Sequence, residues 1–154
     1  MNPQDYNKTI TVNSTPEKVF ASLTTGIEDW WTNGYEGSAA NIGDEFRVYF
    51  AQIHDTTFSI TELVPNERVV WLCTKAHINL PEVTVHDEWK GTKMIWSIKT
   101  NGNKTMLTLH HEGLNNTVQC FDSCTQGWND FFGASLYGFL ETGTGKPFKN
   151  EAVA

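Results

Sequence analysis

Adjacent residues His110, His111 and Glu112 provide the side-chain types of a metal site or an acid–base pair. They end a segment, residues 105–112, whose alternation of apolar and polar residues predicts a β-strand. Neighbouring side chains on a strand point to opposite faces, so the two histidines do not converge on one ion without a bulge. The parity of the leucines in this strand places His111 on the inner face. Two interpretations stay open there: a polar group in a ligand pocket, or a hydrogen-bonded histidine of the core or rim.

Glu62 is the second candidate for chemistry. It shares the parity of Phe58 and Ile60 in the strand predicted for residues 56–64. A carboxylate on the inner face is costly unless it is paired, so it would mark a functional site. A strand twist or a bulge would instead turn Glu62 to solvent. If the protein is an enzyme, His111 or Glu62 is the expected general acid or base.

Cys120 and Cys124 lie one helical turn apart and could supply two zinc ligands. A structural zinc site needs four ligands, and no second Cys/His pair has suitable spacing, so we expect no metal. Cys124 is then expected to pack as a small apolar residue. With Cys73 the chain has three cysteines, an odd number without a framework spacing, which favours a reducing compartment and predicts a cytoplasmic protein.

Other signatures of chemistry are absent from the sequence. There is no glycine-rich phosphate loop, Gly-x-Ser-x-Gly elbow or His-Glu-x-x-His motif, so we assign no catalytic residue and no cofactor, and an enzyme is the less favoured class. A formal net charge of −7 argues against nucleic acid or an anionic membrane as partner. No run approaches the roughly 18 apolar residues of a membrane span, and no signal peptide is expected.

The hydrophobic pattern predicts one α+β domain over residues 1–154, with strands followed by a long C-terminal helix. Ser14 is the expected N-cap of the first helix, with Pro16 in its first turn and Glu17 completing a capping box. The tail from residue 142 is expected to fray. The expected elements are a strand at 8–13, a short helix at 27–31, a loop at 32–43, strands at 44–51, 56–64, 68–74, 89–100 and 105–112, and a helix at 117–140.

The six tryptophans are spread over elements that face one interior. Such an arrangement needs either a bulky core or a cavity lined with aromatic rings, and both interpretations stay open. In the cavity interpretation, Trp30, Trp31 and the glycine-rich loop after them form the entrance. The candidate ligand-binding residues are Trp31, Phe46, Phe58, Glu62, Trp71, Trp96, His111, Trp128 and Phe132.

Several motifs together resemble a known family. They are Trp30-Trp31, the strand-turn-strand at residues 60–71 (ITELVPNERVVW), the segment LTLHHEGL at 107–114, and Gly127-Trp128. With this order and spacing the chain resembles the START-like (SRPBCC, helix-grip) superfamily, and within it the family of activator of heat-shock-protein-90 ATPase homologues (the Aha-type C-terminal domain). The resemblance implies a curved antiparallel sheet wrapped around a long C-terminal helix, with two short helices after the first strand and a deep pocket between sheet and helix.

Three functional hypotheses follow. The first is a binding protein that holds a small hydrophobic or aromatic ligand between the sheet and the C-terminal helix. The second, implied by the resemblance, is an interaction module that acts on a chaperone. The third is a cyclase- or dehydratase-like enzyme that uses the same cavity. A homodimer is a further hypothesis, because a small sheet leaves exposed edges.

Overall fold

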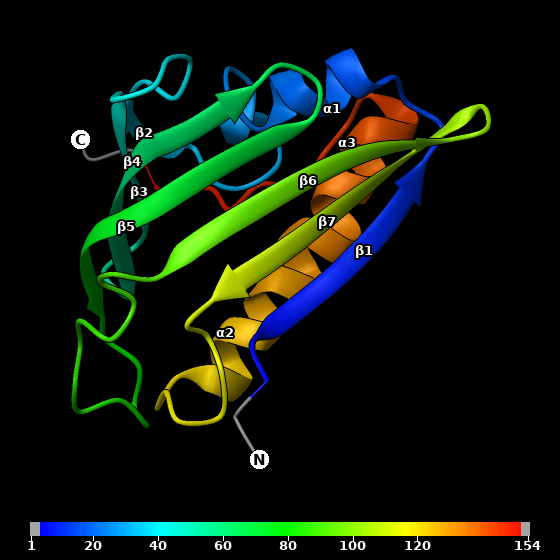
Figure 1. Ribbon diagram of the computed structural model, residues 1–154. Coiled ribbons are helices and arrows are strands. Elements are labelled where there is room, and N and C mark those ends of the chain that lie inside the picture. Colours follow the sequence, from blue (N-terminus) through cyan, green and yellow to red (C-terminus); the bar gives the residue numbers. More distant parts are fainter. Residues whose placement is uncertain (1–3, 152–154) are drawn as a thin grey trace.

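The computed structural model describes residues 4–151, which form a curved antiparallel sheet crossed by a long helix (Figure 1). The strands are hydrogen-bonded in the order β1-β7-β6-β5-β4-β3-β2, and each neighbouring pair is antiparallel. The predicted α+β architecture is therefore confirmed. The strands are β1 (Tyr6–Val12), β2 (Gly34–Gly37), β3 (Glu45–Phe50), β4 (His54–Val64), β5 (Arg68–Ile78), β6 (Lys93–Asn101) and β7 (Lys104–Glu112).

The helices form two groups. Two short ones follow β1, and the others join into one helix that lies across a face of the sheet (Figure 1). The middle of this long helix is a π-helical turn, a rare form that often lies at functional sites. Within residues 4–151 no helix is long and apolar enough to cross a bilayer. The helices are α1 (Pro16–Ser22), the 3₁₀ helix η1 (Ile27–Asp29), α2 (Phe121–Asp130), η2 (Phe131–Leu136) and α3 (Tyr137–Thr142).

The first helix has a different cap from the one expected. Thr15, not Ser14, is the N-cap, and its Oγ1 accepts a hydrogen bond from the backbone N–H of Lys18 at 3.2 Å. The reason is Pro16, which occupies the first helical position and confines the preceding residue to extended backbone, as an N-cap requires. Ser14 is buried, and its carbonyl accepts from the hydroxyl of Thr105 at 2.6 Å.

Strand alternation decides which side chains reach the core. Side chains with the parity expected for the inner face of β5, β6 and β7 are buried in the core, as the sequence predicts. Apolar burial of this kind is the main favourable term in folding. The residues confirmed on this face are Val69, Trp71, Cys73, Met94, Trp96, Ile98, Leu107, Leu109 and His111.

A bulge in β4 reverses this alternation near Glu62. Ile60 pairs with Trp71, but Glu62 pairs with Val70, so Thr61 is an extra residue in the strand. Beyond the bulge, Leu63 packs against the core and the Glu62 side chain is 45% exposed, with its Oε1 2.8 Å from Nε of Arg68. The inner-face placement of Glu62 was therefore wrong, and the alternative of a bulge holds.

Other predicted boundaries also differ from the structure; the long helix, for example, begins at Phe121 and not at residue 117. β5 continues to Ile78, beyond the expected end at residue 74. β6 begins at Lys93, because the four preceding residues form a turn with Gly91 at φ 89°, so Trp89 lies outside the strand. The loop expected at 32–43 contains the short strand β2, which pairs with β3.

The expected fraying of the tail is not found in residues 142–151, and residues 152–154 lie outside the described residues. The backbone N–H of Phe148 donates to the carbonyl of Trp31 at 2.9 Å, and the backbone N–H of Asn33 donates to the carbonyl of Phe148 at 3.0 Å. The Asn150 side chain accepts from the backbone N–H of Ala51 at 2.6 Å and donates to the carbonyl of Tyr49 at 3.1 Å. Residues 144–150, here called the C-terminal strap, are thus fixed to the edge of the sheet formed by β2 and β3.

We expect Asn150→Ala to lower the free energy of unfolding by about 1–2 kcal/mol, because it removes the side-chain hydrogen bonds that anchor the strap. Urea denaturation followed by fluorescence measures the change. Asn116→Ala is the matched control, since Asn116 is exposed in the loop before α2 and makes no side-chain hydrogen bond within residues 4–151. Equal stability of the two variants would contradict an anchoring role for Asn150.

Candidate functional site

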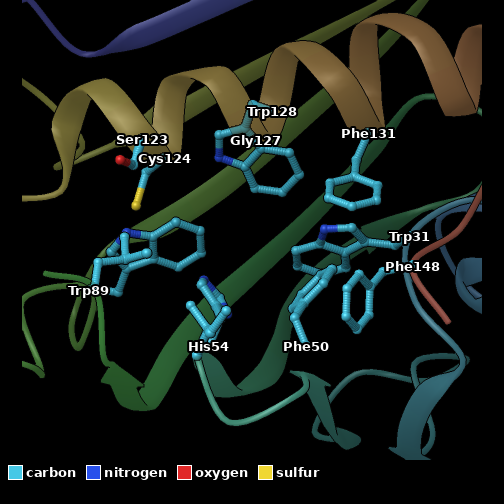
Figure 2. Close-up of a pocket in the computed structure, with 12 residues that line it drawn as sticks. Trp31, Phe50, His54, Trp89, Ser123, Cys124, Gly127, Trp128, Phe131 and Phe148 are labelled. Carbon is cyan, nitrogen blue, oxygen red and sulfur yellow. The ribbon is translucent and has the colours of Figure 1, made fainter. Parts of the chain in front are cut away.

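A cavity of about 250 Å³ lies between α2 and the end of the sheet where β3 turns into β4. Figure 2 shows aromatic rings on both sides of it, with α2 above and the sheet and loops below. Its lining carries no charged side chain among the described residues. The cavity is lined by Trp31, Phe50, Ile53, His54, Leu80, Trp89, Ser123, Cys124, Gly127, Trp128, Phe131 and Phe148.

Five separate parts of the chain supply this lining. On the long helix, Cys124, Gly127, Trp128 and Phe131 recur at steps of three and one, which keeps them on one face. The sheet contributes the end of β3 and the start of β4, and the other parts are the segment after η1, the loop between β5 and β6, and the C-terminal strap. The site exists only when the whole fold has assembled.

Stacked tryptophans form the inner wall. The Trp31 and Trp128 ring centroids are 5.1 Å apart with an interplanar angle of 22°, and those of Trp89 and Trp128 are 6.1 Å apart at 12°. Phe50 packs edge-on against Trp31 at 5.7 Å and also contacts Phe131 at 5.3 Å. Rings held on several sides lose little further freedom when a flat molecule packs against them, so the wall is organised in advance.

His111 fixes two of these tryptophans through a directed chain of hydrogen bonds. The Thr92 hydroxyl donates its single hydrogen to the Trp89 carbonyl at 2.6 Å, so it must accept from Nε2–H of His111 at 2.9 Å. Nδ1 of His111 then has no hydrogen and accepts from Nε1–H of Trp128 at 3.0 Å. Burial lowers the pKa of His111 to about 3, which keeps the ring in the neutral form that this chain requires.

His54 is the titratable side chain of the cavity lining, and the sequence analysis missed it. Its ring packs edge-on against those of Trp89 and Phe50, with ring centroids 4.8 Å and 5.2 Å away. Nδ1 is buried and has no hydrogen-bond partner, and burial lowers the pKa of His54 to about 4. The sequence contained a signal: two residues before the predicted strand start, His54 has the inward parity of Thr56 and Phe58.

The predicted site residues fall into four groups. Trp31 and Trp128 line the cavity, while His111 lies behind it and contacts the lining residues Trp128 and Trp89. Glu62 is exposed and does not line it. The remaining aromatic residues are fully buried in the core next to the wall. There the ring centroid of Trp71 lies 5.1 Å from that of Phe46 and 5.6 Å from that of Trp31. These core residues are Phe46, Phe58, Trp71, Trp96 and Phe132.

The mouth of the cavity differs from the expected entrance. Apart from Trp31, no residue of the segment 30–43 lines the cavity, and Trp30 is buried, with Nε1 donating to the Ser22 carbonyl at 2.8 Å. The exposed lining residues are instead Ile53, which is 48% exposed, and Ser123. Access therefore runs between the β3–β4 turn and the start of α2.

Cys120 and Cys124 are joined by a disulfide across the first turn of α2. Cys124 is buried, as expected of a small apolar residue, but the sequence analysis did not predict its pairing with Cys120. Cys73 is buried and free. Within residues 4–151 no group of three or more histidine, cysteine or acidic side chains is arranged to hold a metal ion.

The fold and the placement of the cavity define the class: a START-like (SRPBCC) domain, with a curved sheet closed by the C-terminal helix. Comparison with protein families makes this specific. The family model described as "Activator of Hsp90 ATPase homolog 1-like protein" matches residues 13–141. The chain belongs to this family, as the sequence motifs predict.

Solved structures agree with the assignment. The Aha1 dimer from Colwellia psychrerythraea is 30% identical in sequence, with a TM-score of 0.73 over 94% of this chain and 100% of that chain. The fold is shared by protein SSP2350 from Staphylococcus saprophyticus (14% identity, TM-score 0.68, 93% of this chain and 96% of that one). CalU16 from Micromonospora echinospora also shares it (17% identity, TM-score 0.59, 82% and 72%). The search of curated proteins found no match.

We expect acid to destabilise the protein through His111. Its pKa is about 3 when folded, against 6.5 as the ordinary value, so between these limits only the unfolded chain takes up the proton. Stability is complete above about pH 6.5 and falls by up to about 1.4 kcal/mol per pH unit below it. Urea denaturation between about pH 6 and pH 4.5 should give a shallower pH dependence for His111→Gln than for wild type.

The matched control is His77→Gln, because His77 is exposed on β5 and makes no side-chain hydrogen bond within residues 4–151. Its pH dependence should equal that of wild type. A His111→Gln slope as steep as that of wild type would show that the buried imidazole is not the group responsible.

Proposed function

We propose that this protein binds a small, uncharged, aromatic ligand in the cavity between α2 and the sheet. The observation that carries the proposal is the lining itself, which consists mainly of ring faces and edges with no charged side chain. Concave, mostly apolar sites with few polar groups are typical of small-molecule binding. The ligand would pack against rings that are already held in place by the core.

The size of the cavity supports a ligand of about two fused rings. An engineered apolar cavity of about 150 Å³ binds benzene, and this one is larger, at about 250 Å³. Charge supports a neutral ligand, because an ion would lose its hydration without gaining an opposite charge from the lining. Burial of the ligand contributes roughly 25 cal/mol per Å² of apolar surface before the cost of association.

Gly127 offers a way to fill the cavity without disturbing the fold. It lies in the middle of α2 and lines the cavity, and a Cβ placed on it would have no heavy atom within 4 Å. A larger side chain at this position therefore projects into free space. Replacing a glycine inside a helix also removes an unfavourable helix propensity of up to about 1 kcal/mol.

We expect Gly127→Leu to weaken binding of naphthalene at least tenfold while leaving the free energy of unfolding equal or slightly higher. Isothermal titration calorimetry measures the first quantity and urea denaturation the second. The matched control is Gln126→Leu, which adds the same side chain one position earlier on the exposed face of α2 and should bind as wild type does. Unchanged affinity in Gly127→Leu would place the ligand elsewhere.

A second candidate function is favoured by the family description, which refers to the ATPase of a chaperone. In this case the protein would contact an Hsp90-type chaperone and change its rate of ATP hydrolysis. Addition of the purified protein to the chaperone, with the rate followed by phosphate release, tests it. An unchanged rate and no co-elution would remove this candidate. The cyclase-like alternative finds neither of its two acid–base candidates, His111 and Glu62, in the cavity lining.

We also propose self-association into a homodimer. The support is the Colwellia psychrerythraea relative, which is described as a dimer in solution. Within residues 4–151, β1 and β2 are the outermost strands of the sheet, and an outer strand can pair with a second copy of the chain. Light scattering coupled to size-exclusion chromatography decides between one and two copies.

A further inference from the structure

His54 distinguishes this cavity from a purely apolar one. It is the side chain at the start of β4, and Figure 2 shows its ring rising from the sheet side into the space between Trp89 and Phe50. Both neighbours present carbon to it, at centroid distances of 4.8 Å and 5.2 Å. Neither ring nitrogen has a hydrogen-bond partner within residues 4–151, and Nδ1 is shielded from solvent.

An unpartnered polar atom in such a place needs an explanation. A buried donor or acceptor without a partner is destabilising, and native proteins rarely tolerate it. His111, which is buried as a whole residue, follows the rule, because its two nitrogens are hydrogen-bonded to Thr92 and Trp128. His54 breaks the rule, and it does so in the lining of a cavity.

We propose that His54 hydrogen-bonds the polar group of the ligand, and that this group is a neutral hydroxyl attached to the aromatic ring. The inference rests on the proposed function, and it adds the ligand's chemistry to it. A neutral imidazole has one N–H and one lone pair, and a hydroxyl can pair with either, whichever nitrogen carries the hydrogen.

Competing ligand chemistries fit the same surroundings less well. A carboxylate would enter a lining without any cationic side chain, beside a histidine whose neutral form is favoured because burial holds its pKa at about 4. Trp89 Nε1 is also unpartnered, but Figure 2 shows it directed toward Cys124, away from His54. The imidazole of His54 is therefore the group expected to hydrogen-bond the ligand hydroxyl. A hydrocarbon without a polar group would fill the cavity but give the imidazole no hydrogen-bond partner.

Three probes of one shape test this: naphthalene, 2-naphthol and 2-naphthoate, each titrated by calorimetry into the full chain at pH 7.5. We expect 2-naphthol to bind about five- to tenfold more tightly than naphthalene, as one net hydrogen bond allows, and 2-naphthoate to bind more weakly than both. In His54→Phe, which keeps an aromatic ring in the wall, 2-naphthol should bind no more tightly than naphthalene.

Two further variants keep the result interpretable. His54→Gln, which retains a donor and an acceptor, should recover part of the preference for 2-naphthol, and His77→Phe on the exposed part of β5 should keep all of it. Equal binding of naphthalene and 2-naphthol by wild type would overturn the role of His54 and leave the proposed function standing. Absence of binding by all three probes would overturn the proposed function as well.

Discussion

The position of the Trp128 ring is the constraint on which the rest of the site depends. This side chain joins the long helix to three other parts of the molecule: it stacks on Trp31, runs parallel to Trp89 and meets the edge of Trp96 at 5.9 Å. Its one polar atom is bound to His111 on β7. Because the ring is fixed by both stacking and a hydrogen bond, one face of the cavity is as rigid as the core. In a well-packed protein interior, movement of one side chain displaces its neighbours, because there is little free space to take up the movement.

Core and cavity are two uses of the same aromatic cluster. Phe46, Phe58, Trp71 and Trp96 are fully buried in the core, where they pack against one another. Toward the end of the sheet where β3 turns into β4, aromatic rings are packed on one side only. Their other side lines the cavity. The two interpretations of the tryptophans in the sequence are thus both correct, each for a different part of the set.

The sequence predicted those features that follow from local periodicity. Alternation placed Trp71, Trp96 and His111 on the inner face, since strands impose a period of two wherever they are regular. It failed at Glu62, because the bulge at Thr61 adds one residue and reverses the parity, and a bulge has no strong sequence signature. It also failed at His54, because strand ends cannot be read to within two residues from a single sequence.

The strap was missed for a different reason. Asn150 is held by contacts with residues about a hundred positions away, which no local pattern contains. Family motifs fixed the superfamily and the fold, but they carry no information about which ring lines a cavity and which lies in the core. That distinction depends on how the elements pack in three dimensions, which no local sequence pattern contains.

The division of the cavity wall between the core and the strap has a consequence for how related proteins diverge. Substitution of Trp31 or Trp128 disturbs the packing between the long helix and the sheet, so it is expected to lower the stability of the fold strongly. Phe148 contributes to the same wall from a short peripheral segment that is attached mainly through backbone and asparagine hydrogen bonds. Mutations in that segment can reshape the cavity while the scaffold is conserved. Changes in the shape of the cavity would therefore arise first in residues 144–150, and relatives with the same core are expected to differ most in this stretch.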